Sequence, residues 1–270
     1  YFSRAAVAAP HFEAARAGKA ILAEGGDAIE AMLAMAAAIA IVYPHMNSIG
    51  GDAFWLVREP NGRVRYIEAC GFAGRKATIE SYRQDGHSYI PRRGPRAALT
   101  VPGAVGGWAM ARELSRSLGG KLPLDALLHA GIRLAREGYA QSKSEARYGH
   151  REKEDLFAAP GFAATFLVDG KVPEAGAPRR NERLGATLQH LADAGLEDFY
   201  RGDIGREIAA DLERIGSPVT RADLETYRPV AREPLSLKLP GRTLYNSPPP
   251  TVGVAALATL GMFERLGVKE

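Results

Sequence analysis

Residues 25–75 constrain this chain more than any other part, because an almost uncharged helix there runs into a glycine-flanked loop and then a hairpin. Between residues 29 and 42 a helical repeat places apolar side chains on every face. A helix without a polar face is buried, so we expect this one at the centre of the molecule. The loop that follows it is then positioned to reach a pocket.

The ends of this helix are marked by residues with known capping behaviour. A preceding amphipathic helix over residues 11–24 stops at Gly25 and Gly26. Asp27 can cap the next helix, with Glu30 three residues later in the capping-box position. Pro44 ends the buried helix, because the residue before a proline avoids the helical conformation.

A hairpin follows the loop. Residues 53–58 and 64–69 are rich in strand-forming side chains, and the pair Asn61-Gly62 between them favours a tight turn. We expect this hairpin to be part of the core sheet.

The rest of the chain predicts mainly helices with apolar residues at three- and four-residue spacing. We expect helices over residues 104–120, 123–136, 182–194 and 204–214, a short one after Thr220, one from Val254 to near Gly267, and strands over 235–239 and 242–246. The polar segment 142–155 predicts an exposed helix or a connector. We expect residues 1–270 to form a single domain of mixed α and β structure.

Composition excludes several classes of protein. The net charge is +4, but basic and acidic residues alternate without a dense basic run, which disfavours nucleic-acid binding. The one cysteine, Cys70, rules out an intrachain disulfide and a multi-cysteine zinc site. The most apolar run, residues 31–43, is too short to span a bilayer, so we expect no membrane anchor. We expect a cytoplasmic protein, and because the chain opens at Tyr1, a periplasmic or secreted protein with a removed signal stays an alternative.

The usual self-contained catalytic motifs are absent from the sequence. No zinc-ligand spacing, Walker loop or nucleophile elbow occurs in the context that it requires. The glycine pairs, such as Gly50-Gly51, form no dinucleotide-binding pattern.

Four residues are candidates for a binding site. His45 and Asn47 lie on the loop after the buried helix, where they either reach a ligand or satisfy backbone groups of the turn. Cys70 ends a strand, where a lone cysteine is more often a small buried apolar group than a nucleophile. Asp52 is expected to support the Gly50-Gly51 loop.

Four blocks of sequence, in order, resemble the gamma-glutamyltransferase family of self-cleaving amide hydrolases. They are GGDAIEAMLAMAAAIA with PHMNSIGGDAFWLV (residues 25–57), LTVPGAVGGW (99–108), LPLDALLHAGIRLAREGY (122–139) and the segment from DFYRGDIG to SPPP (198–250). The resemblance implies an N-terminal-nucleophile hydrolase fold, an α/β (α+β) protein with two stacked sheets between helical layers (αββα). The chain resembles the helix-rich large subunit, or most of it, which a small subunit from the same precursor completes.

In this family the new N-terminal Thr of the small subunit is the nucleophile, and its own amine acts as the base. The resemblance therefore implies that no catalytic residue lies in this chain, since Tyr1 has no nucleophilic oxygen of that kind, and that no metal or organic cofactor is needed. Within the chain, His45, Asn47 and Cys70 are expected to line the site for a small-molecule amide. Whether two heterodimers pair stays open.

One residue departs from the family pattern. True gamma-glutamyltransferases carry an arginine at the position of Cys70, where it clamps the α-carboxylate of the glutamyl group. A thiol cannot replace that anchor, which is worth about 1.5–3 kcal/mol. The run from Tyr43 to Trp55 most resembles the oxamate amidohydrolase branch, whose substrate is a small anionic amide, and we expect Trp55 and Phe72 to narrow the pocket. The alternatives are a glutathione-type gamma-glutamyl enzyme and an inactive binding relative that is not cleaved.

Overall fold

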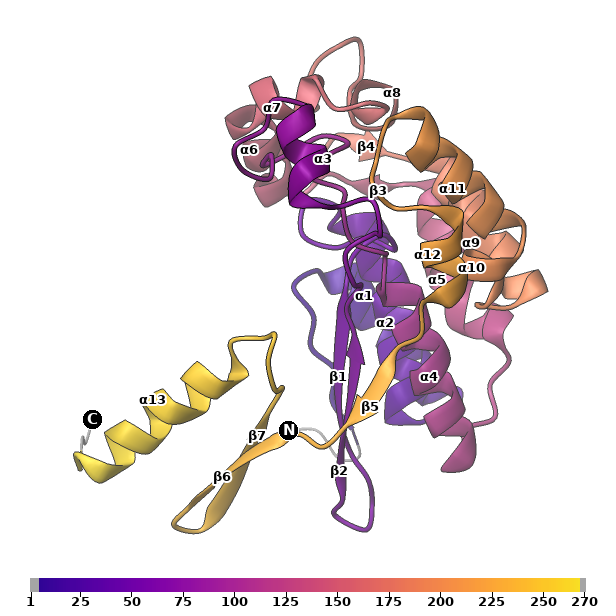
Figure 1. Cartoon of the computed structure of the whole chain (residues 1–270). Coiled ribbons are helices and arrows are strands. Elements are labelled where there is room, and N and C mark those ends of the chain that lie inside the picture. The colour runs from indigo at the N-terminus through magenta and orange to yellow at the C-terminus, as the bar shows by residue number, and fades with distance from the viewer. Residues whose placement is uncertain (1–4, 268–270) are drawn as a thin grey trace.

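A computed structural model describes residues 5–267 of the chain. Its main body is a stack of helices covered on one side by a small sheet (Figure 1). The stack consists of α1 (Phe12–Ala23), α2 (Ala28–Val42), α4 (Ala104–Ser117), α5 (Leu124–Glu137) and α9 (Glu182–Ala194). Helix α2 packs against α1, α5 and α4, so the uncharged helix lies at the centre, as the sequence predicts.

The start of α2 is anchored by buried polar groups. The Asp27 carboxylate accepts hydrogen bonds from the backbone N–H groups of Ile29 and Glu30, and the Glu30 carboxylate accepts one from the Asp27 N–H, which confirms the capping box. Glu30 is almost fully buried and also accepts a 2.7 Å bond from the Leu122 N–H. Its carboxylate is therefore paired on both oxygens, as a buried charge must be.

Three antiparallel strands form the sheet beside α2 and α4, in the order β1–β2–β5. They are β1 (Ala53–Arg58), β2 (Val64–Ala69) and β5 (Val230–Arg232). The hairpin has the predicted bounds, whereas β5 was not predicted. Along β1 the side chains alternate, so Trp55 is buried while Phe54 and Leu56 are exposed. On β2, residues 66–69 are all buried, whichever face they point to. The sheet therefore packs on the helices with one face, and its other face is open along β1.

Short elements gather at the end of the sheet away from the hairpin turn (Figure 1). They include α3 (Ile79–Gln84), β3 (Tyr139–Ala140), α6 (Lys143–Arg151), α7 (Lys153–Phe157), α8 (Phe162–Phe166) and β4 (Pro178–Arg179). The polar segment 142–155 is thus helical, which is one of the two alternatives predicted for it. A second group, α10 (Asp198–Arg201), α11 (Asp203–Arg214) and α12 (Arg221–Thr226), packs beside α9. Helices α3, α8 and α10 were not predicted.

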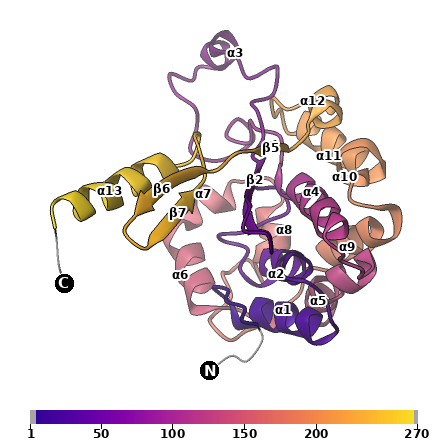
Figure 2. The same ribbon diagram turned by 90° about the horizontal axis from the view of Figure 1, so that it is seen from below.

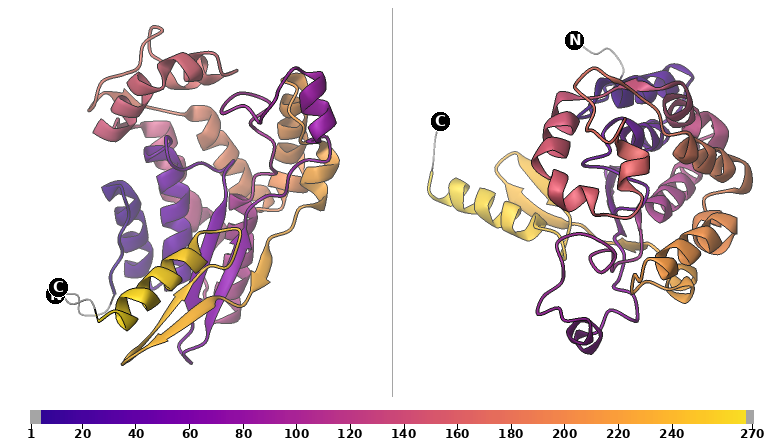
Figure 3. Two further views of the ribbon diagram at one scale, coloured as in Figure 1. Left: turned by 60° about the vertical axis from the view of Figure 1, so that its left-hand side comes forward. Right: turned by 90° about the horizontal axis from the view of Figure 1, so that it is seen from above.

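The last elements form a unit that projects from the main body, as Figure 2 and Figure 3 show. It consists of the hairpin β6 (Leu235–Leu239) and β7 (Arg242–Asn246) and the helix α13 (Gly253–Arg265). Several large apolar side chains of α13 are exposed, including Leu260, Met262 and Phe263. In residues 5–267, no helix is long and apolar enough to cross a membrane.

Candidate functional site

The loop after α2 is folded into a tight turn by one carbonyl. Tyr43 ends the helix, and its carbonyl oxygen accepts hydrogen bonds from the N–H groups of Met46 (3.1 Å) and Asn47 (3.0 Å). His45 and Asn47 are both half-buried on this turn. The turn places His45 on the side of α6 and leads the chain directly into the glycine loop.

The glycine loop connects α4 with the end of β2. The carbonyl of Gly51 accepts 2.8 Å hydrogen bonds from the N–H groups of Gly103 and Ala104, at the start of α4. The Asp52 carboxylate accepts a 3.2 Å bond from the N–H of Gly71, which follows Cys70. Asp52 therefore connects the loop with the end of β2.

Two glycines permit this close packing. A Cβ atom on Gly103 would overlap the carbonyl oxygen of Ala69 and lie 2.8 Å from the Tyr227 hydroxyl. A Cβ atom on Gly71 would overlap the carbonyl oxygen of Val101. Both positions have backbone on the side where a side chain would stand, so only glycine fits without a shift of the chain.

Cys70 is half-buried at the end of β2. Burial, followed by the negative charges of Glu68 and Asp52, raises the pKa of its thiol above the ordinary value. A thiol of raised pKa is protonated near neutral pH, and the thiolate is the reactive form. Cys70 is accordingly uncharged here, without the properties of a nucleophile or a carboxylate anchor.

His45 is held between two aromatic rings. Its ring centroid lies 4.2 Å from that of Tyr43 and 5.9 Å from that of Tyr148 on α6. Burial lowers its pKa below the ordinary value, so the imidazole is neutral at pH 7. Both ring nitrogens are buried and have no hydrogen-bond partner among the described residues.

The candidate residues other than Cys70 line two different cavities, and Asn47 belongs to both. Asn47 and Asp52 line a cleft of about 510 Å³ that runs along α2 and β1. Asn47 and His45 line a groove of about 580 Å³ against α6. Within residues 5–267, Cys70 lines neither cavity and is connected to the others through the bond from Gly71 to Asp52.

Trp55 and Phe72 do not narrow one pocket together. Trp55 is 8 % exposed and faces the helices, where its indole nitrogen lies close to Gly107. Phe72 is 43 % exposed, with its ring 6.2 Å from that of Tyr227. The two side chains are separated because Trp55 points to the helical face of the sheet and Phe72 lies beyond the end of β2.

Sequence reasoning missed the contribution of α6 to this region. Four of its residues line the groove with His45 and Asn47: Ser144, Arg147, Tyr148 and Arg151. Their spacing of three and four residues was the available signal, because it puts them on one helical face. No group of three or more His, Cys, Asp or Glu side chains suited to a metal ion occurs among the described residues.

Comparison with known proteins identifies the architecture. The fold matches the crystal structure of the Helicobacter pylori gamma-glutamyltranspeptidase with a TM-score of 0.90 and 26 % identity, over 98 % of this chain and 76 % of that one. It is the N-terminal-nucleophile hydrolase fold, of which the described residues supply helices and part of the sheet structure. The family model described as Gamma-glutamyltranspeptidase matches residues 14–270, and the chain belongs to this family.

Two curated relatives refine the comparison. An oxamate amidohydrolase proenzyme of Klebsiella pneumoniae is 46 % identical over 259 residues, which are 96 % of this chain and 49 % of the relative. A glutathione hydrolase-like YwrD proenzyme of Bacillus subtilis is 34 % identical over 96 % of this chain and 48 % of its own length. The chain thus spans about half the length of these relatives, and both are named as proenzymes.

Proposed function

We propose that this chain is the large-subunit part of a self-cleaved amide hydrolase whose substrate is a small anionic amide such as oxamate. The observation that carries the proposal is the 46 % identity to an oxamate amidohydrolase proenzyme over nearly the whole chain. Cys70 supports the same substrate class, because an uncharged thiol stands where gamma-glutamyl enzymes need an arginine. The substrate would then be held by other groups.

The partner in this proposal is the small subunit from the same precursor. Strand β1 has an unpaired edge in the described sheet, and the cleft of about 510 Å³ lies along it. Met32, Phe54 and Leu56 line that cleft and are each more than 40 % exposed. An exposed strand edge with apolar neighbours favours addition of another strand, so a second chain would bury these groups.

The proposed chemistry is acyl transfer to the N-terminal Thr of that second chain. The Thr oxygen attacks the amide carbonyl, its amine takes the proton, and the C–N bond breaks to release ammonia. Water then attacks the ester carbonyl, the bond to the Thr oxygen breaks, that oxygen regains its proton, and the acyl group is released as oxalate. In this proposal the chain contributes one side of the cleft along β1 and the loop of Gly51 and Asp52. Hydrogen bonds fix this loop from two sides.

A glutathione-type activity is the second candidate, because the Bacillus subtilis relative has a glutathione hydrolase-like name. Turnover by the processed protein separates the two: ammonia release from oxamate is measured beside anilide release from a gamma-glutamyl anilide. The proposal predicts that kcat/KM for oxamate is the higher of the two. Efficient hydrolysis of the gamma-glutamyl anilide with none of oxamate would refute it.

A further inference from the structure

One face of α6 forms a wall of the groove beside the His45 loop. Ser144, Arg147, Tyr148 and Arg151 follow one another at intervals of three, one and three residues, so they share a face of the helix. Opposite them lie Tyr43, His45, Met46 and Asn47. The groove has a volume of about 580 Å³, which is enough for a small organic anion.

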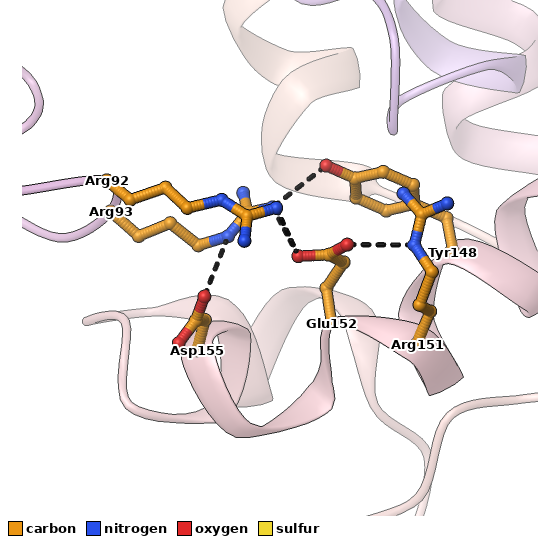
Figure 4. Close-up of polar contacts among 6 residues, drawn as sticks. All are labelled: Arg92, Arg93, Tyr148, Arg151, Glu152 and Asp155. Atoms are coloured by element: carbon orange, nitrogen blue, oxygen red, sulfur yellow. Dashed lines mark hydrogen bonds and ion pairs between the residues drawn. The ribbon is translucent and has the colours of Figure 1, made fainter.

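The arginines on and beside this wall differ in whether they have an acidic partner. Figure 4 shows that Glu152 is shared: its carboxylate binds Arg151 at 2.8 Å and Arg93 at 3.0 Å, and Arg92 reaches it at 2.9 Å. The Arg93 guanidinium also donates a 2.9 Å bond to the Tyr148 hydroxyl, which fixes that ring. Three arginines therefore share the single negative charge of Glu152.

Among the described residues, Arg147 is the arginine of the groove wall that has no charged partner, whereas Arg151 is paired with Glu152. Arg147 is exposed, and it has no ion pair or side-chain hydrogen bond with any residue of the described range. The residues that line the groove include no aspartate or glutamate. Arg147 also stands four residues from Arg151 on the same face, an arrangement of like charges that destabilises a helix. A bound anion would relieve this repulsion.

We propose that this groove binds a small carboxylate anion, with Arg147 as its charged anchor. A guanidinium offers paired donors that match the two oxygens of a carboxylate. The Asn47 amide lies across the groove, and its side chain has no hydrogen bond among the described residues, so it can donate to the same anion. Identifying that anion with the substrate rests on the proposed function; binding of a carboxylate does not.

Arg147 would also provide a positive charge that the chain lacks at Cys70, where the family carries an arginine. An anionic amide needs a cation somewhere in its path, and the uncharged thiol cannot supply one. Arg147 would supply it from α6, next to the loop that Asp52 ties to the end of β2. The carboxylate bound in the groove could belong to either of two molecules: the substrate or the released product.

Titration calorimetry with oxalate on the processed two-chain protein tests the binding step without requiring turnover. Arg147→Gln is expected to weaken oxalate binding at least about tenfold, the low end for a charge-assisted hydrogen bond. Arg147→Lys keeps the charge and should lose less. Arg183→Gln removes an exposed arginine of α9 that has no ion pair in the described range, and it should bind oxalate like the wild type. Equal affinity of the Arg147→Gln variant and the wild type, or no oxalate binding by the wild type, would overturn the inference.

Kinetics then distinguish the two sources of the carboxylate. If the groove holds the substrate, Arg147→Gln raises KM for oxamate and leaves KM for the neutral diamide oxamide unchanged. If it holds the product, the same variant weakens inhibition by oxalate and leaves KM for oxamate unchanged. A protein that hydrolyses neither amide would refute the proposed function, while the oxalate titration would still decide the anion site.

Discussion

Replacing Gly103 by alanine tests whether the junction of the glycine loop, β2 and α4 is as tightly packed as described. The added Cβ would overlap the Ala69 carbonyl oxygen and stand 2.7 Å from its carbon and 2.8 Å from the Tyr227 hydroxyl. These neighbours are backbone or buried, so the chain around residue 103 has to move. Such overpacking costs about 1–3 kcal/mol.

The movement also strains the bonds that hold the loop. The N–H groups of Gly103 and Ala104 both donate to Gly51, and each bond contributes about 1 kcal/mol. The total loss is about 3–5 kcal/mol. In a two-chain protein about twice the length of this chain, 1 kcal/mol corresponds to roughly 1 °C, so the unfolding midpoint should fall by at least about 3 °C.

Thermal unfolding of the processed protein, followed by tryptophan fluorescence, measures this loss. Trp55 and Trp108 are buried around the junction and report on it directly. Gly50→Ala is the matched control, because the nearest atom to its added Cβ is 3.6 Å away, and its midpoint should change by about 1 °C or less. A Gly103→Ala protein as stable as the Gly50→Ala protein would refute the packing described here.

Three further predictions follow from single residues. Cys70→Arg restores the charge of the family clamp, so kcat/KM for a gamma-glutamyl anilide should rise about tenfold or more in a steady-state assay; no gain would show that other groups exclude the glutamyl chain. Burial raises the pKa of Glu145 to about 6 from 4.5, so the native state keeps a proton that the unfolded chain loses, and stability falls as pH rises through that window. Between pH 4.5 and pH 7, the free energy of unfolding of the wild type, measured by chemical denaturation, should fall by about 2 kcal/mol relative to that of Glu145→Gln. The same change with pH in both proteins would contradict this. Asp27→Ala removes the cap of α2 and should cost about 1 kcal/mol in the same measurement, with Asp27→Asn closer to wild type.

Local sequence signals predicted the elements that depend on local interactions. The turn at Asn61-Gly62 set the hairpin, and the capping pair Asp27 and Glu30 set the start of α2, both with bounds close to those observed. Strand β5 was missed because its three residues are exposed and acquire their structure only by pairing with β2, more than a hundred residues earlier in the chain.

The site was predictable only in part for the same physical reason. The loop position of His45 and Asn47 follows from the end of α2, which is a local feature. The connection of Asp52 to Gly71 and the approach of Arg147 to the groove depend on tertiary packing. A polar helix such as α6 shows in sequence which residues share a face, and only the fold shows what that face meets.

The most direct test of the central claim is the mass and N-terminal residue of every chain in protein purified from the full gene. We predict two chains, the second of which begins with Thr, because the proposed chemistry requires that residue as nucleophile and base. A single uncut chain, or a second chain with another first residue, would contradict the claim and indicate a binding protein that has kept the fold without the activity.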